Sequence, residues 1–111
     1  MPGKQYTNKN VAAYIIDLER KNPLYTTVEG VGKCRRNFAN LVADLEKGDF
    51  GAVVVARAAF LFVDTSPMWM EKFIATVKRY HILVIDATSQ REYDLCATED
   101  ELTFRAEGKN L

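Results

Sequence analysis

The sequence predicts an α/β fold, with an open, mostly parallel sheet in a three-layer arrangement that has helices on both faces. Two features of residues 38–63 carry this prediction. Apolar side chains first recur with helical spacing, at Phe38, Leu41, Val42 and Leu45, which places them on one face of a helix. Gly48 then provides the left-handed residue that commonly ends a helix. Residues 52–56 follow as a run of small and β-branched apolar residues, typical of a parallel strand buried on both faces.

The rest of the chain is expected to form one domain with a short arm in front of it. With 111 residues, the chain is long enough for a single hydrophobic core. Residues 1–9 are polar, include a proline and a glycine, and show no periodicity. We therefore expect a flexible arm over residues 1–9, followed by a single α/β domain over residues 10–111.

The N-terminal third of that domain is expected to contain a helix and then a strand. Asn10 fits an N-cap, and Pro23 disfavours helix in the residue before it, which together predict a helix over residues 10–22. The apolar face of this helix would carry Val11, Tyr14, Ile15 and Leu18. Residues 24–29 have the composition of a strand, and Gly30-Val31-Gly32 predicts the loop that ends it.

The C-terminal half predicts two further helices with a strand between them. Ser66 followed by Pro67 is typical of an N-cap and a first helical residue, and a buried strand is expected over residues 82–85. Thr98 and Glu101 fit a capping box that opens the last helix. The apolar side of that helix is expected to include Leu102 and Ala106.

The alternation of helices and strands predicts the topology of the sheet. Residues 52–56 and 82–85 are expected to pair in parallel through a right-handed crossover. With three expected strands, the sheet would lack one central strand. The N-terminal arm, a second copy of the chain or a rearranged topology is expected to cover the edge that this leaves unpaired.

A pattern within residues 33–107 matches a known family. Phe38 opens an apolar helix that ends in Asp-Leu-x-x-Gly, and an Asp-Phe pair and a Val-Val-Val strand follow. The match continues through Ile82-Leu83-Val84-Ile85 to Tyr93-Asp94-Leu95. In these motifs the chain resembles the catalytic domain of serine recombinases, the resolvase/invertase family. The resemblance implies a resolvase-like fold and a role in DNA recombination.

The positions that carry the family's chemistry differ in this chain. The family domain starts with a central strand that ends in Tyr-x-Arg-x-Ser, whose serine attacks DNA, and that strand is not recognisable in this sequence. After the Val-Val-Val strand, the family's aspartate corresponds to Ala59, and its two arginines correspond to Phe60 and Val63. Covalent catalysis needs the nucleophile, and stabilising the transition state needs the arginines. We therefore expect a pseudoenzyme without catalytic residues.

Four basic residues are candidates for contacts with DNA or another phosphate. Arg35 and Arg36 occupy the Arg-Pro positions with which the family's helix begins, Lys33 precedes them, and Arg57 follows the Val-Val-Val strand. Cations at a helix N-terminus oppose the helix dipole, so a bound anion would stabilise this arrangement. The alternative is that these basic side chains are simply exposed to solvent at the start of the helix and bind no anion.

Residues 57–65 are expected to form a loop or irregular turn, and the apolar part of this segment suggests an interface. Phe60, Leu61, Phe62 and Val63 stand where the relatives are charged. The formal net charge is +0, which gives little repulsion between copies, so we expect a homodimer that uses this run. The alternative is burial of the run against the chain's own third helix, near Trp69 and Met70.

Composition supports few other functional classes. Fifteen basic residues balance fifteen acidic ones, so no overall field attracts nucleic acid. No apolar run approaches the length of a membrane helix. Cys34 and Cys96 lack metal-ligand spacing and fit reduced thiols in a cytoplasmic protein, and His81, the one histidine, has no matching ligands. We expect no metal and no cofactor.

Two functional hypotheses follow from these observations. The first is a catalytically inactive resolvase-like domain that acts by self-association or by binding a DNA-processing partner. The second is a DNA-binding or strand-exchange recombinase component whose missing catalytic parts come from another chain. The salt dependence of DNA binding separates them, because phosphate contacts impose a steep salt slope.

Overall fold

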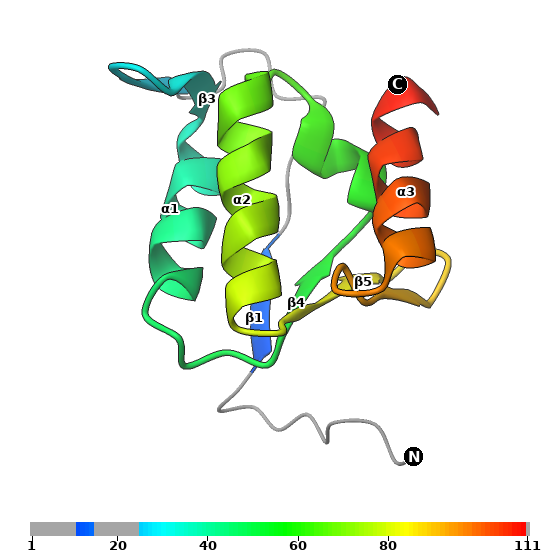
Figure 1. Ribbon diagram of the computed structural model, residues 1–111. Helices are drawn as coiled ribbons and strands as arrows, with labels where there is room; N and C mark the ends of the chain where they lie inside the picture. Colours follow the sequence, from blue (N-terminus) through cyan, green and yellow to red (C-terminus); the bar gives the residue numbers. More distant parts are fainter. Residues whose placement is uncertain (1–10, 15–24, 111) are drawn as a thin grey trace.

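The computed structural model describes residues 11–14 and 25–110, which form a mixed α/β fold (Figure 1). The main sheet has four strands in the order β1-β4-β5-β6. These strands are β1 (Val11–Tyr14), β4 (Ala52–Val55), β5 (Leu83–Asp86) and β6 (Arg91–Tyr93). Strands β1, β4 and β5 run parallel, whereas β6 is antiparallel to β5. The predicted parallel pairing of β4 with β5 is confirmed.

The three described α-helices pack on one face of this sheet, with α1 and α2 side by side (Figure 1). They are α1 (Arg36–Leu45), α2 (Pro67–Arg79) and α3 (Thr98–Glu107). The strand order steps in one direction from β1 to β4 to β5, so right-handed crossovers put α1 and α2 on the same side. Among the described residues, the second helical layer that we expected is therefore absent.

A chain of aromatic rings joins the three helices to the sheet. The ring centroids of Phe38 on α1 and Phe73 on α2 lie 5.5 Å apart, and those of Phe73 and Phe104 on α3 lie 6.1 Å apart. Phe104 also contacts Tyr93 of β6, at 5.6 Å. All four side chains are almost completely buried, so they stabilise the fold both by their buried area and by ring packing.

Strand β1 corrects the prediction for the N-terminal segment. Val11–Tyr14 was expected to begin a helix, but these residues pair with β4 from Val11↔Ala52 to Tyr14↔Val55. The run of apolar residues fits a buried strand as well as a helix face, and the free edge of β4 decides between them. Residues 15–22 of the expected helix lie outside the described part of the chain. β1 therefore adds a strand that we did not predict, at the edge of the described sheet beside β4.

The strand predicted over residues 24–29 belongs to a separate hairpin. β2 (Tyr25–Val28) pairs antiparallel with β3 (Gly32–Arg35), a strand that we did not predict. Gly30 and Gly32 have φ values of 80° and 94°, which glycine adopts without strain. A Cβ on Gly32 would lie 3.0 Å from the Ser66 side chain. The turn of the hairpin extends away from the main sheet, at the upper left of Figure 1.

The start of α2 agrees with the sequence, and the start of α3 does not. Ser66 is the N-cap of α2 and its Oγ accepts a hydrogen bond from the Trp69 N–H at 3.2 Å. Thr98 is instead the first residue inside α3, and the N-cap Ala97 offers no side-chain cap. Leu102 is 63 % exposed, while Phe104 is fully buried. The expected capping box and apolar side of α3 are therefore wrong.

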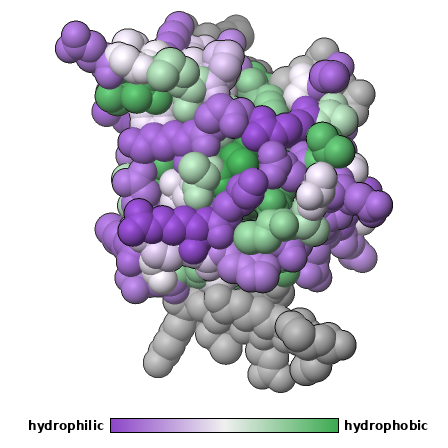
Figure 2. Space-filling model, in the orientation of Figure 1, coloured by the Kyte–Doolittle hydropathy of each residue, from purple (hydrophilic) through white to green (hydrophobic). Residues whose placement is uncertain are grey.

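Charged side chains cover much of the helical face. Arg105 of α3 forms two hydrogen bonds to the Glu71 carboxylate of α2, at 2.6 and 2.9 Å, and Lys78 of α2 lies 2.7 Å from Glu101 of α3. Figure 2 shows that hydrophilic side chains separate the apolar atoms of this face into small areas. Within the described part of the chain, no helix is long and apolar enough to cross a membrane.

Candidate functional site

The four basic residues expected to contact phosphate lie in two parts of the fold. Lys33, Arg35 and Arg36 lie together where β3 passes directly into α1. Arg57 follows β4 and precedes the 3-10 helix η1 (Ala58–Phe62). The first group therefore forms a local basic site, which we call the hairpin site.

Tyr25 and Asp64 organise the hairpin site. The Lys33 ammonium lies 3.8 Å from the centroid of the Tyr25 ring, and Arg36 donates a hydrogen bond to the Tyr25 carbonyl oxygen at 3.4 Å. The Tyr25 hydroxyl donates to Asp64 Oδ2 at 3.0 Å. Desolvation, followed by the hydrogen bond to Asp64, raises the pKa of Tyr25, so the hydroxyl remains a neutral donor at physiological pH.

Arg35 is an internal residue of this site rather than a surface cation. Its side chain is 7 % exposed, and its Nη2 lies 3.9 Å from Asp64 Oδ2, whose side chain is 54 % exposed. Asp64 has a φ of 52°, a strained backbone for a residue with a Cβ. The expected direct contact of Arg35 with a phosphate is not accessible in this arrangement. Arg35 instead lies beside Asp64, whose Oδ2 also accepts the hydrogen bond from Tyr25.

The N-terminus of α1 completes the hairpin site. No acidic residue occupies the first turn of α1, and the N-cap Arg35 makes no side-chain cap. The first N–H groups of a helix have no partner within the helix, and the helix dipole places partial positive charge there. With Lys33 and Arg36 exposed beside it, this helix start has the charge and the donors to bind an anion.

Arg57 lies at the carboxyl edge of the parallel strands. Its guanidinium carbon lies 5.7 Å from the centroid of the Phe60 ring, and Asp86 at the end of β5 shares this edge. Asp86 accepts hydrogen bonds from the Ala58 and Ser89 N–H groups, both at 2.9 Å. Burial favours a higher pKa for Asp86, but these hydrogen bonds outweigh it and lower the pKa. The ionised Asp86 side chain therefore joins the segment after β4 to the turn after β5.

The three positions that the sequence resemblance assigned to catalytic residues, Ala59, Phe60 and Val63, carry no polar side chain. Ala59 is 3 % exposed, and Phe60 and Val63 are half-buried. Leu61, expected at an interface, is fully buried in the chain's own core. Phe62 packs on α3, with its ring centroid 5.2 Å from that of Phe104. Leu61 belongs to the same buried core as Trp69 and Met70, as our alternative expected, while Phe62 packs on α3.

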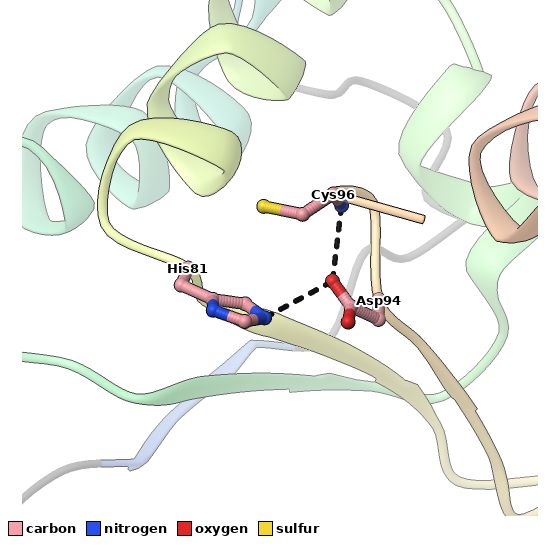
Figure 3. A group of neighbouring side chains, drawn as sticks. All are labelled: His81, Asp94 and Cys96. Carbon is pink, nitrogen blue, oxygen red and sulfur yellow. Dashed lines mark hydrogen bonds and ion pairs between the residues drawn. The ribbon is translucent and has the colours of Figure 1, made fainter. Parts of the chain in front are cut away.

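The structure also brings together three side chains that the sequence did not connect. His81, Asp94 and Cys96 lie close together where α2 ends and the segment after β6 returns (Figure 3). The spacing Asp94-x-Cys96 is a weak signal of paired ligands, and His81 lies 13 residues before Asp94 in the sequence. The proximity of the histidine arises from the antiparallel pairing of β5 with β6, which the sequence did not predict.

Comparisons with known proteins gave no match. No family model matches the chain, and no curated protein and no solved structure is significantly similar to it.

Proposed function

We propose that this chain is a catalytically inactive, resolvase-like domain that contacts the DNA backbone through the hairpin site and acts together with a DNA-processing partner. The observation that carries the proposal is the start of α1, where exposed Lys33 and Arg36 flank a helix N-terminus without an acidic residue. Backbone phosphates are the anions that such a site would meet on DNA.

Strand β1 supports the resolvase-like part of the proposal. The family domain begins with a central strand that ends in Tyr-x-Arg-x-Ser. β1 lies at the edge of the described sheet, and it ends at Tyr14. Counting from that tyrosine, the arginine corresponds to Ile16 and the serine to Leu18. The β1-β4-β5 order with α1 and α2 between the strands is compatible with the open sheet that the resemblance implies.

The same comparison supports the absence of recombinase chemistry. A nucleophilic hydroxyl would be replaced by the side chain of Leu18, and the transition-state arginines by Phe60 and Val63. Losing one charge-stabilising group alone commonly costs about 100- to 1,000-fold in rate. We therefore propose that the domain binds DNA without cleaving it.

Fluorescence anisotropy of labelled duplex DNA across a salt series tests this function. If Lys33 and Arg36 each contact one phosphate, replacing both with glutamate should weaken binding and make the slope of log K against log salt shallower by about 1.8. The same samples, denatured after incubation with supercoiled DNA, should contain no covalent protein–DNA adduct.

A matched control reverses one charge away from the hairpin site. Lys109 is exposed on the C-terminal 3-10 helix η2 (Gly108–Asn110), and Lys109→Glu should leave the salt slope unchanged. Equal losses for Lys109→Glu and for the hairpin variants would contradict a localised phosphate site. Absence of DNA binding by the wild-type chain would refute the proposal.

A second candidate function is self-association through the exposed part of the η1 segment. Phe60 and Val63 are half-buried within the chain, so they keep apolar surface that a second copy could cover. The formal net charge of +0 adds little repulsion between copies. The oligomeric state distinguishes this function from DNA binding.

A further inference from the structure

We propose that His81, Asp94 and Cys96 form a zinc site with three protein ligands. The three residues lie at the end of α2 and in the segment between β6 and α3 (Figure 3). One potential ligand atom from each residue lies within 4.8 Å of the other two. The site is separate from the hairpin site and does not depend on the proposed DNA binding.

The distances are close to those required by a tetrahedral ion. Nitrogen and oxygen ligands about 2.1 Å from zinc lie about 3.4 Å from one another, and the corresponding distance to a thiolate sulfur is about 3.6 Å. His81 Nε2 and Asp94 Oδ1 are already 3.2 Å apart. The Cys96 sulfur lies within 4.8 Å of the ligand atoms of His81 and Asp94, and its side chain is exposed and free of close packing.

The donor set favours zinc over the common hard cations. Zinc accepts thiolate, imidazole and carboxylate ligands in one tetrahedral site, whereas magnesium and calcium require mostly oxygen ligands. On binding, Cys96 would release its proton to solvent and bind as a thiolate. The thiolate and the Asp94 carboxylate then balance the charge of the ion, and the fourth position remains open to water.

The backbone around Asp94 already holds two of the ligands in place. Asp94 Oδ1 accepts a hydrogen bond from the Cys96 N–H at 3.0 Å, and the Asp94 carbonyl oxygen accepts one from the Ala97 N–H at 2.9 Å. The Asp94 N–H donates to Asp100 Oδ2 at 2.9 Å. Such outer contacts orient ligands before the metal arrives.

The backbone at His81 adopts a conformation that favours glycine. The Ile82 N–H donates to the Val77 carbonyl oxygen at 2.8 Å, and the His81 N–H donates to that of Lys78 at 3.3 Å. This is the Schellman pattern, in which glycine is the usual residue at the left-handed position. His81 occupies that position with a φ of 49°. The strain is retained at the residue whose imidazole faces Asp94.

The surrounding charge also favours a cation. The C-terminal end of α2 carries partial negative charge from its dipole, and the cluster lies beside it. Three carboxylates occupy the first turn of α3, at Glu99, Asp100 and Glu101. The ammonium of Lys78, a residue of the last turn of α2, lies 2.7 Å from the Glu101 carboxylate, which offsets its positive charge.

A cysteine nucleophile is a less suitable interpretation of the same residues. In such sites the imidazole lies between a carboxylate and the thiol and accepts the thiol proton. Here the Cys96 thiol donates to the Lys78 carbonyl oxygen at 3.5 Å. A metal site does not require a hydrogen bond between the thiol and the imidazole. Each group binds the ion directly, and this agrees with the arrangement of the cluster.

Titration of the reduced, metal-free full chain with zinc chloride tests the site. Calorimetry should show one zinc ion per chain. Cobalt(II) in place of zinc should give the visible bands of a tetrahedral site together with a thiolate-to-cobalt charge-transfer band. Cys96→Ser and His81→Gly should each weaken zinc binding by more than about 100-fold, because even outer-shell partners contribute 10- to 100-fold.

The control is Gln90→Gly. Gln90 has a φ of 59° and is exposed, so the substitution relieves the same backbone strain at a position outside the cluster. It should leave zinc binding unchanged, and circular dichroism should show that all variants are folded. No saturable zinc binding by the wild type, wild-type affinity in Cys96→Ser and His81→Gly, or half an ion per chain would overturn the proposal.

Discussion

At the scale of single residues, the positions with positive φ fall into two groups, those occupied by glycine and those occupied by residues with a side chain. Gly48 and Gly32 adopt positive φ values where a Cβ would meet the Tyr80 ring at 2.9 Å or the Ser66 side chain at 3.0 Å. Packing and backbone both require glycine there. His81 and Asp64 adopt positive φ values with side chains that take part in the two candidate sites. At those two positions the backbone conformation alone would favour glycine, so the side-chain contacts offset the strain.

His81→Gly is expected to stabilise the metal-free protein by about 1 kcal/mol, because glycine adopts the left-handed conformation without steric cost. Urea unfolding in the presence of a chelator measures this change. Gln90→Gly should also raise the free energy of unfolding. A loss of stability in His81→Gly would mean that the exposed contact between His81 and Asp94, 3.2 Å long, outweighs the backbone strain.

At the scale of elements, the start of α2 connects the hairpin to the main sheet. Ser66 Oγ accepts from the Trp69 N–H and donates to the Val31 carbonyl oxygen at 2.7 Å. The Ser66 N–H donates to the Lys33 carbonyl oxygen at 2.9 Å, and the Trp69 indole N–H donates to that of Gly32, also at 2.9 Å. One N-cap therefore fixes both the helix and the hairpin site.

Ser66→Ala is expected to destabilise the protein by about 1–2 kcal/mol, because it removes an N-cap and a hydrogen bond to the hairpin. Thr98→Ala is the matched control. Thr98 does not cap α3, so its replacement should change the free energy of unfolding by less than about 0.5 kcal/mol. Thermal unfolding followed by circular dichroism measures both. Equal losses would show that Thr98 caps α3 in solution.

At the scale of the whole molecule, one part of the η1 segment packs in the core of the chain, and another part is exposed and available for the proposed self-association. Phe62, the last residue of η1, packs its ring on Phe104 of α3, and a Cβ on Gly108 would lie 2.6 Å from this ring. Phe60 contacts Arg57 and keeps part of its ring exposed. The two phenylalanines, two residues apart in the sequence, should therefore respond differently to a charge.

Phe62→Asp is expected to lower the free energy of unfolding by about 3 kcal/mol or more, because it replaces a packed ring with a charge. Phe60→Asp should leave the chain folded and convert the proposed dimer into a monomer. Light scattering with circular dichroism distinguishes these outcomes. A wild-type chain that is monomeric at high micromolar concentration would contradict the proposed self-association.

The sequence by itself determined the segments whose signals are local. The helical spacing from Phe38 to Leu45, the Ser66-Pro67 start of α2 and the apolar runs of β4 and β5 all depend on neighbours within a few residues. The parallel pairing of β4 with β5 followed, because a helical crossover of this length leaves few other connections. The two exposed cations Lys33 and Arg36 could also be placed near a helix start from the sequence alone.

Tertiary structure decided what depended on distant partners. Val11–Tyr14 became a strand because β4 offers a free edge, and the polar residues of β3 became a strand because β2 pairs with them. Arg35 is buried, and its charged partner is Asp64, 29 residues away in the sequence. The His81–Asp94–Cys96 cluster depends on the turn from β5 into β6. Such contacts leave no periodic signal in the sequence, because periodicity records which face of an element is buried and not which residue covers it.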